Sequence, residues 1–333
     1  MKLKTLLLLL FILPFSINSF SQDLHRDLLI YYPLDGNAID YSGHGNDGVN
    51  NAITTTDRTN TAGKAMAFNG VDTYIDLPGN PELKPSFPFS VSFWVYFEEG
   101  ATYIMTTDFA IDNHSGVWFN RMLDKRFSMS VGNAGGNTSP SQRSSFDTDY
   151  VMEDKTWYHV AAVWYNAIDA EVYINAFLRE TFNSGTAQEM GYTNANGTIG
   201  RMDRNVISEP EYFEGKIDEF YMWKRALTQE DVNELFYGSG LSKTDNINFI
   251  QGALTLSPNP TTDLIYLKST DNFQLQGIQI FDTSGKLMLV SNENGYNISL
   301  DVSNLPSGTY FIKMLGYNQS KHPVFSTGTF VKQ

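Results

Sequence analysis

The segment Phe89-Ser90-Val91-Ser92-Phe93-Trp94-Val95-Tyr96-Phe97 places a large apolar side chain at every second position. Successive side chains of a β-strand point to opposite faces, so these five apolar residues share one face of a strand. The intervening Ser90, Ser92, Trp94 and Tyr96 line the other face, and two of them are aromatic. We therefore predict a strand that is covered, at least in part, on both faces.

Several other segments repeat this two-residue period, and helical periodicity is nearly absent. The predicted strands include residues 158–164, 171–174, 198–200 and 216–223. Short runs of Gly, Asn and Asp separate the strands, as in residues 132–137, and such runs favour turns and loops. Many short strands joined by turns predict an all-β protein that folds as an antiparallel sandwich.

One helix is predicted near the end of this region. Thr228 and Asp231 have the spacing of a capping box, and an apolar stripe follows at Val232, Leu235 and Phe236. We expect this short helix to pack on the edge of the sandwich. Periodicity is then lost, so we place a linker at residues 241–253.

Five segments occur in a characteristic order, namely residues 32–48, 67–75, 89–95, 157–161 and 215–228. Together they resemble the laminin-G-like or concanavalin A-like lectin family across residues 27–240. The resemblance implies a concanavalin A-like antiparallel β-sandwich, or jellyroll. The family usually has Asn-Gly or Asp-Gly in the hairpin at residues 173–177, whereas this chain has Asn175-Ala176. Because Ala is poorly suited to a positive φ, we expect another type of turn there.

The last part of the chain, residues 254–333, carries three further landmarks. They are Ser257-Pro258-Asn259-Pro260, residues 280–286, and residues 305–313 with Leu-Pro-Ser-Gly-Thr-Tyr. In this order they resemble the C-terminal sorting domain of type IX secretion cargo. The resemblance implies a second, smaller β-sandwich, and implies that the type IX secretion machinery recognises residues 256–333 and delivers the protein to the cell surface.

The N-terminus agrees with export. Lys2 and Lys4 precede an apolar run, and Ser19 and Ser21 flank Phe20 in the small-x-small pattern of a cleavage site. We interpret residues 1–21 as a secretory signal peptide. The apolar run is too short to span a bilayer, and no later run approaches the required length of about 20 residues. We therefore expect no membrane-spanning segment.

Composition restricts the partners. The formal net charge is −14 and the pI is about 4.7, which argues against nucleic acid and anionic lipid surfaces as ligands. The chain has no cysteine, so no disulfide can stabilise it outside the cell. A structural calcium ion is therefore expected as a cofactor.

The predicted calcium site combines a Gly-rich loop with the last strand of the lectin-like domain. In a jellyroll of this family the first and last strands lie side by side, which would bring Asp40 near Asp218. Calcium takes about 6 to 8 oxygen ligands, and the candidate ligands are Asp40, Ser42, His44, Asn46 and Asp218. The alternative is that Asp40 caps its own turn and that Asp218 or Glu219 pairs with Lys216 or Arg225.

Lectin-like domains recognise ligands through loops that carry aromatic, amide and carboxylate groups. The candidate ligand-binding residues lie in two loops and are Asp112, Asn113, His114, Trp118, Asn133 and Asn137. Trp118 is expected to be an exposed ring whose replacement by Ala weakens binding without unfolding the domain. The alternative is that it packs in the core, as most aromatic residues of a sandwich do.

No segment has the Glu-x-Asp-x-x-Glu pattern of jellyroll glycosidases, and Asp218 and Glu219 are neighbours on opposite faces of a predicted strand. We therefore expect a non-enzymatic, secreted cell-surface protein that binds a polysaccharide or a glycoprotein. A protein-binding adhesin or matrix component without sugar specificity is the first alternative. A divergent glycan-active enzyme is the second.

The sorting assignment predicts the fate of a truncated protein. Deletion of residues 256–333 should leave the protein in the periplasm, because the export machinery would have nothing to recognise. Cell fractionation and surface labelling measure this directly. Surface display of the truncated protein at the level of the full chain would contradict the assignment.

Overall fold

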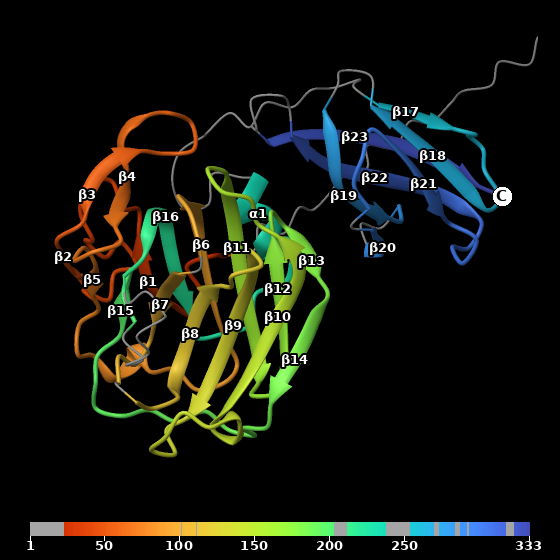
Figure 1. Cartoon of the computed structure of the whole chain (residues 1–333). Coiled ribbons are helices and arrows are strands. Elements are labelled where there is room, and N and C mark those ends of the chain that lie inside the picture. Colours follow the sequence, from red (N-terminus) through yellow and green to blue (C-terminus); the bar gives the residue numbers. More distant parts are fainter. Residues whose placement is uncertain are drawn as a thin grey trace, which may run out of the picture.

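The computed structural model describes residues 23–100, 102–110, 112–202, 212–237, 254–269, 273–283, 287–291, 293–317 and 323–333. The predicted signal peptide and linker lie outside these residues. The described chain folds as a large β-sandwich followed by a smaller set of strands, as Figure 1 shows. The predicted all-β jellyroll class is therefore confirmed.

The first sheet of the large sandwich has eight strands. In order across the sheet they are β13 (Phe177–Arg179), β12 (Asp169–Ile174), β11 (Trp157–Asn166), β6 (Phe89–Phe97), β16 (Glu214–Trp223), β4 (Ala62–Asn69) and β3 (Ile53–Thr56), with β1 (Leu28–Tyr32) also pairing with β16. The predicted strands at residues 89–97, 158–164, 171–174 and 216–223 all lie in this sheet.

The second sheet also has eight strands and packs against the first. In order they are β14 (Thr181–Gly185), β10 (Arg143–Val151), β9 (Arg126–Asn133), β8 (Ser115–Arg121), β7 (Thr102–Thr106), β15 (Thr198–Ile199), β5 (Ile75–Asp76) and β2 (Val49–Asn50). Short strands β2 and β3 form one open edge of each sheet, at the left of Figure 1.

Strand β6 is buried on both faces. Phe89, Val91, Phe93, Val95 and Phe97 belong to the core between the two sheets, and each is inaccessible to solvent. Trp94 points to the other face, where it packs in a second apolar cluster with helix α1 (Gln229–Tyr237). The prediction of a strand covered on both sides is confirmed, and the helix supplies the second cover.

The start of α1 has the predicted capping box. The Asp231 backbone N–H donates to Thr228 Oγ1 at 3.2 Å, and the Thr228 backbone N–H donates to Asp231 Oδ2 at 2.8 Å. Arg225 adds two charge-assisted hydrogen bonds to the same carboxylate, at 2.6 and 3.1 Å. Asp231 is fully buried, so this ion pair anchors the helix to the end of β16.

The hairpin between β12 and β13 corrects one expectation. Asn175 and Ala176 have φ values of 55° and 65°, so the turn does place Ala176 at a positive φ. Two hydrogen bonds hold Asn175: its N–H donates to His159 O, and its Oδ1 accepts from His159 N, both at 2.8 Å. Contacts with the neighbouring strand therefore override the preference of Ala for negative φ.

The smaller sandwich has a three-stranded and a four-stranded sheet around its own apolar core. The strands, in order across each sheet, are β17 (Leu254–Ser257), β18 (Leu264–Ser269) and β21 (Asn297–Asp301), and then β20 (Leu287–Ser291), β19 (Gln274–Phe281), β22 (Gly308–Tyr317) and β23 (Pro323–Lys332).

Within the described ranges, no helix has both the length and the apolar character needed to cross a bilayer.

The Arg225–Asp231 pair makes a pH-dependent contribution to stability. Burial alone would raise the pKa of Asp231, but hydrogen bonds from Arg225 and Thr228 outweigh it and hold the pKa below its usual value. A lowered folded-state pKa stabilises the fold above the unfolded pKa of about 4, and this stabilisation is lost as pH falls further.

Asp231→Asn should therefore lower the free energy of unfolding by about 3 kcal/mol at pH 7. The difference from the parent should shrink as the pH falls below about 4. Denaturant unfolding at a series of pH values measures it, with Asp169→Asn, at the exposed start of β12, as the control without effect. An equal loss at every pH would contradict this role for the charge.

Candidate ligand-binding pocket

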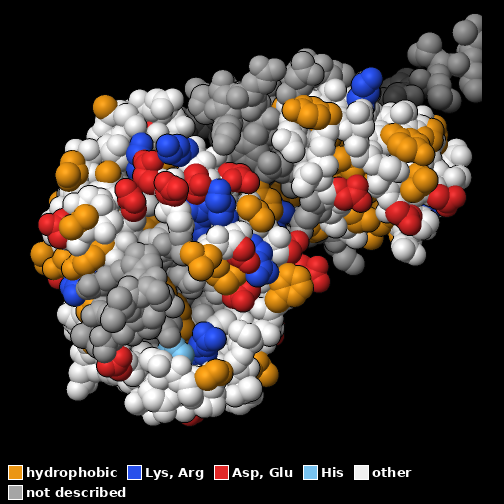
Figure 2. Space-filling view, viewed as in Figure 1, with side chains coloured by type: hydrophobic (Ala, Val, Ile, Leu, Met, Phe, Trp, Pro, Cys, Tyr) orange, Lys and Arg blue, Asp and Glu red, His pale blue; other side chains and the backbone are white. Residues whose placement is uncertain are grey.

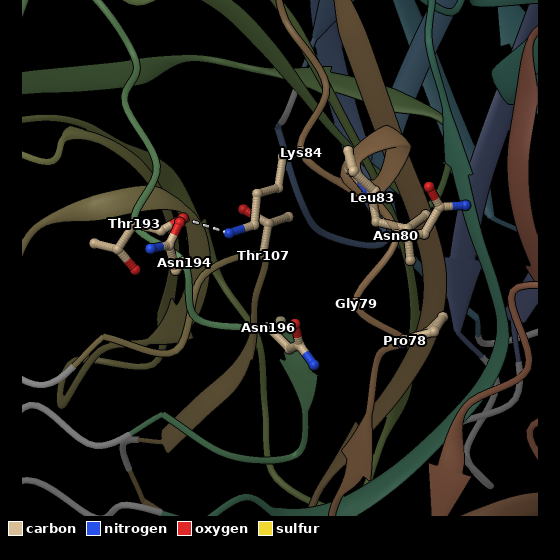
Figure 3. Close-up of a pocket in the computed structure, with 11 residues that line it drawn as sticks. Pro78, Gly79, Asn80, Leu83, Lys84, Thr107, Thr193, Asn194 and Asn196 are labelled. Carbon is tan, nitrogen blue, oxygen red and sulfur yellow. Dashed lines mark hydrogen bonds between the residues drawn. The ribbon is translucent and has the colours of Figure 1, made fainter.

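A pocket of about 290 Å³ opens at one end of the large sandwich (Figure 3). Three segments that are distant in sequence form it: the β5–β6 connection, the end of β7, and the chain that leads into β15. Polar and apolar groups contribute about equally to its lining, which consists of Pro78, Gly79, Asn80, Pro81, Leu83, Lys84, Thr107, Thr193, Asn194, Asn196 and Gly197.

Asn80 fixes the first wall. Its Oδ1 accepts the Glu82 N–H at 3.0 Å and so caps the short 3₁₀ helix Pro81–Leu83. Its Nδ2 donates to Asn46 Oδ1 at 2.7 Å, which ties the wall to the loop at residues 40–47. The capped turn places Leu83 in the main core, and this packing holds the wall of the pocket in position.

Lys84 links the two walls. Its Nζ donates to the Thr193 carbonyl at 2.5 Å, the contact drawn in Figure 3, and lies 3.9 Å from Asp108 Oδ2. The Asp108 side chain is fully buried, and it also accepts hydrogen bonds from the backbone N–H and, at 2.6 Å, the hydroxyl of Thr193. The ammonium charge of Lys84 is therefore balanced by a carboxylate behind the pocket.

Asn194 and Asn196 lie at the exposed mouth of the pocket. The carboxamide of Asn196 faces Gly79, where an added Cβ would lie 3.2 Å from Asn196 Oδ1. Gly79 therefore leaves room for this amide in the opening, which Figure 3 shows. Amide donors and acceptors, with no carboxylate in the lining, suit a neutral ligand rich in hydroxyl groups.

Asp40 closes its own loop. Its carboxylate accepts hydrogen bonds from the backbone N–H groups of Tyr31, Ser42 and Asn46 at 2.9 to 3.0 Å, and from Ser42 Oγ at 2.8 Å. These donors occupy the oxygens that a cation would need. The geometry is that of a capped turn, which is the alternative to a calcium site.

The other predicted calcium ligands are also engaged. Asn46 is buried and donates through Nδ2 to the Leu29 carbonyl at 2.9 Å. His44 is exposed, and its Nδ1 lies 3.7 Å from a Glu82 carboxylate oxygen. No described His, Asp or Glu residues gather in threes around a position for a metal ion. Calcium binding by the predicted residues therefore stays a prediction.

Asp218 is paired with a base that sequence reasoning did not identify. Arg58 Nη1 donates to Asp218 Oδ2 at 2.9 Å, and the Arg58 guanidinium lies over the Trp94 ring at 4.4 Å from its centroid. Burial and the neighbouring Glu219 carboxylate raise the pKa of Asp218 well above its usual range. The partner of Asp218 is thus Arg58, which is 160 positions away in the sequence, and not the expected Lys216 or Arg225.

The structure brings the two predicted ligand-binding loops together. The Gly136 N–H donates to Asn113 Oδ1 at 3.3 Å, and the Ala134 N–H to the His114 carbonyl at 2.8 Å. Asn133 and Asn137 cap their own turns through their Oδ1 atoms. Asp112 and Asn137 are exposed, and Asp112 has a φ of 57°.

Trp118 is buried, which corrects the expectation of an exposed ring. Only 1% of it is accessible, and it stacks on the equally buried His114 with ring centroids 5.2 Å apart. Tyr103 and Met202 complete this small cluster. Trp118 therefore contributes to packing on the outer face of the second sheet.

One Ser–His pair invites comparison with a hydrolase site. Ser92 Oγ lies 2.8 Å from His159 Nε2, but both residues are buried. Burial, followed by the charge of Arg58, lowers the pKa of His159 to about 3. A neutral imidazole without access to substrate holds the sheet together and does not activate a nucleophile.

Comparison with known proteins agrees with this architecture. Residues 69–233 match the concanavalin A-like lectin/glucanases superfamily, and residues 255–323 match the secretion system C-terminal sorting domain. The large sandwich is thus a concanavalin A-like, laminin-G-type domain, and the smaller one is a type IX sorting domain. The sorting domain supports secretion. A search of curated proteins finds no significant match.

Two solved structures share the fold at low sequence identity. The binding domain of Paraclostridial Mosquitocidal Protein 1 is 14% identical, with 88% of this chain and 77% of that chain covered, at a TM-score of 0.50. A botulinum neurotoxin type C structure is 13% identical, with 92% and 71% covered, also at 0.50. That toxin's cell entry is described as dependent on interaction with two ganglioside molecules.

Sequence reasoning missed the pocket residues themselves. The Asn-rich segment 193–197 is recognisable as a loop, as is Gly79-Asn80-Pro81. Lys84 and Thr193 are 109 positions apart, however, and no pattern in the sequence joins them.

The geometry at Asp40 predicts a stability effect that is independent of calcium. Asp40→Ala should lower the free energy of unfolding by about 3 kcal/mol, because three backbone N–H groups lose a charged acceptor. Asp47→Ala, which removes the acceptor of a single N–H, should cost about 1 kcal/mol. Thermal melts with calcium and with a chelator measure both. A loss at Asp40 that appears only with calcium would support the metal site instead.

Proposed function

We propose that this chain is a secreted, surface-attached carbohydrate-binding protein and that the pocket beside Lys84 and Asn196 holds a neutral sugar. The observation that carries the proposal is the set of hydrogen-bonding groups in this pocket, where amides and hydroxyls line the opening beside apolar groups and without a carboxylate. Sugars are bound by such convergent hydrogen-bonding groups on a rigid scaffold.

Charge favours a neutral ligand over an acidic one. Lys84 is the single cation of the lining, and Asp108 balances it at 3.9 Å. The chain carries a formal net charge of −14, and Figure 2 shows acidic side chains in a band across the upper part of the large sandwich, next to Lys and Arg. The net charge of the chain as a whole therefore disfavours a sulfated or uronic acid polymer as ligand.

The pocket lacks the groups for glycoside hydrolysis. That reaction uses two carboxyl groups across the scissile bond, about 5 to 10 Å apart. Asp108 lies behind the lining and is held by Thr193 and Lys84. Binding without turnover is therefore the chemistry that this pocket supports.

Exposed apolar residues favour protein adhesion as a second candidate. Val49 and Ile53, on the open edge strands β2 and β3, are 75% and 63% exposed. Apolar side chains on unpaired edges suit contact with another protein. A protein that binds no glycan but retains surface adhesion would move the assignment to this function.

A glycan array tests the proposal on the chain without its signal peptide. Neutral polysaccharides and neutral glycoprotein glycans should be compared with anionic ligands, namely gangliosides and sulfated and uronic acid polymers, with calcium and with a chelator. We expect binding to neutral glycans that does not weaken with salt. Binding restricted to anionic polymers and abolished by salt would contradict the proposed pocket chemistry.

Asn196→Ala should weaken glycan binding about tenfold, because the loss of one or two hydrogen bonds in a pocket costs about 1.4 kcal/mol. Asn183→Ala removes the same side chain from the exposed edge strand β14 and should leave affinity unchanged. Isothermal titration measures both variants against the best glycan of the array. Equal affinity of the two variants would place the binding site elsewhere.

A further inference from the structure

The large and small sandwiches meet at a defined contact. Ala176 in the turn of the β12–β13 hairpin and Phe177 at the start of β13 touch strand β19 of the sorting domain. Figure 1 shows the smaller sandwich beside β13 and α1, at the upper right of the larger one. We define residues 175–177 as the hairpin tip.

Phe177 forms the apolar part of this contact. Its side chain is fully buried and belongs to the apolar cluster that includes α1. On the sorting domain, an added Cβ at Gly277 would lie 3.0 to 3.1 Å from the Phe177 ring atoms Cδ1, Cε1 and Cγ. Any larger residue at 277 would push the ring or the strand away, so the absence of a side chain lets β19 approach.

The hairpin tip also provides a polar contact. Gln279 is fully buried, and its Nε2 donates to the Ala176 carbonyl at 2.9 Å. Gln229 of α1 donates to the same carbonyl at 3.0 Å. The Ala176 carbonyl therefore accepts two hydrogen bonds, one from the sorting domain and one from the lectin-like domain.

A third observation extends the contact to α1. Lys313 of β22 pairs in register with Gln279. Burial lowers the pKa of Lys313, and the charge of Glu230 in α1 opposes this shift. The two strands of the sorting domain and the helix are thus close enough for their charges to interact.

The contact and the ligand pocket lie at different levels of the large sandwich: the pocket is near the Phe89 end of β6, and the hairpin tip is level with the middle of β6. Strand β6 starts at Phe89, five residues after the pocket residue Lys84, and runs towards Phe97. Its Phe93 pairs with Val160, which pairs with Ile174 just before the hairpin tip. The hairpin tip therefore points away from the pocket end.

We propose that the hairpin tip is a docking surface for β19, so that the sorting domain is carried as a fixed extension of the lectin-like domain while the pocket stays open. The Phe177 ring occupies the space that the absent side chain of Gly277 leaves, and the Ala176 carbonyl accepts a hydrogen bond from the Gln279 amide. This interface is independent of any ligand.

A cysteine pair tests the docking, and the absence of native cysteine gives a clean background. The Cγ of Phe177 marks the approximate place of a cysteine Sγ, and a disulfide puts Sγ about 3 Å from the partner Cβ. Phe177→Cys with Gly277→Cys should form a disulfide in the full chain on mild oxidation. Mass spectrometry of the linked peptides measures its yield over time.

The matched control pairs Phe177→Cys with Gly308→Cys. A Cβ at Gly308 meets only the edge of Tyr310, at 3.9 Å, and Gly308 starts β22 away from the hairpin tip. We expect the 177–277 pair to form its disulfide on the order of tenfold faster than the control, because docking raises the effective concentration of the two thiols. Equal rates would overturn the proposal.

A second variant leaves Phe177 intact. Gly277→Leu should displace β19, raise hydrogen exchange at residues 175–177 and lengthen the full chain in small-angle scattering. Gly308→Leu should change neither. Unchanged hydrogen exchange and unchanged dimensions in Gly277→Leu would also overturn the docking. If the substitution unfolds the sorting domain instead, protection from exchange will be lost across β18 and β21. In that case the disulfide rates of the two cysteine pairs test the docking.

Discussion

Burial of strand β6 on both faces is the constraint on which the rest of the structure depends. Its inward face packs between the two sheets, and its outward Trp94 packs under α1. The helix is held there by the buried Arg225–Asp231 pair. The same outer cluster continues to Phe177, where the sorting domain is seated. One doubly covered strand thus connects the core, the helix and the second domain.

The fold could be predicted from the sequence because its determinants are local. The two-residue period of β6 and the Thr228–Asp231 capping box are patterns within single segments, and both are confirmed. The site could not be predicted, because its determinants are non-local. Asp40 could cap a turn or bind a cation, and only the positions of three backbone N–H groups distinguish the two. Similarly, the pairing of Arg58 with Asp218 depends on how distant strands are placed.

The two proposals give separate tasks to two regions of the large sandwich. At one end, loops that carry Asn80, Lys84 and Asn196 surround a neutral polar pocket. Level with the middle of β6, the hairpin tip receives the sorting domain through Ala176 and Phe177. Because the hairpin tip points away from the pocket end of β6, a sorting domain docked at the tip leaves the pocket open. The same chain can therefore carry its sorting domain and keep its ligand pocket accessible at the same time.

The central claim is that the pocket end binds a neutral glycan. The most direct measurement is a hydrogen-exchange footprint of the full chain with and without a neutral oligosaccharide that the array identifies. We expect slower exchange at residues 78–84 and 193–197, with no change at the hairpin tip. Protection confined to the edge strands β2 and β3, or no protection at the pocket under saturating glycan, would contradict the claim.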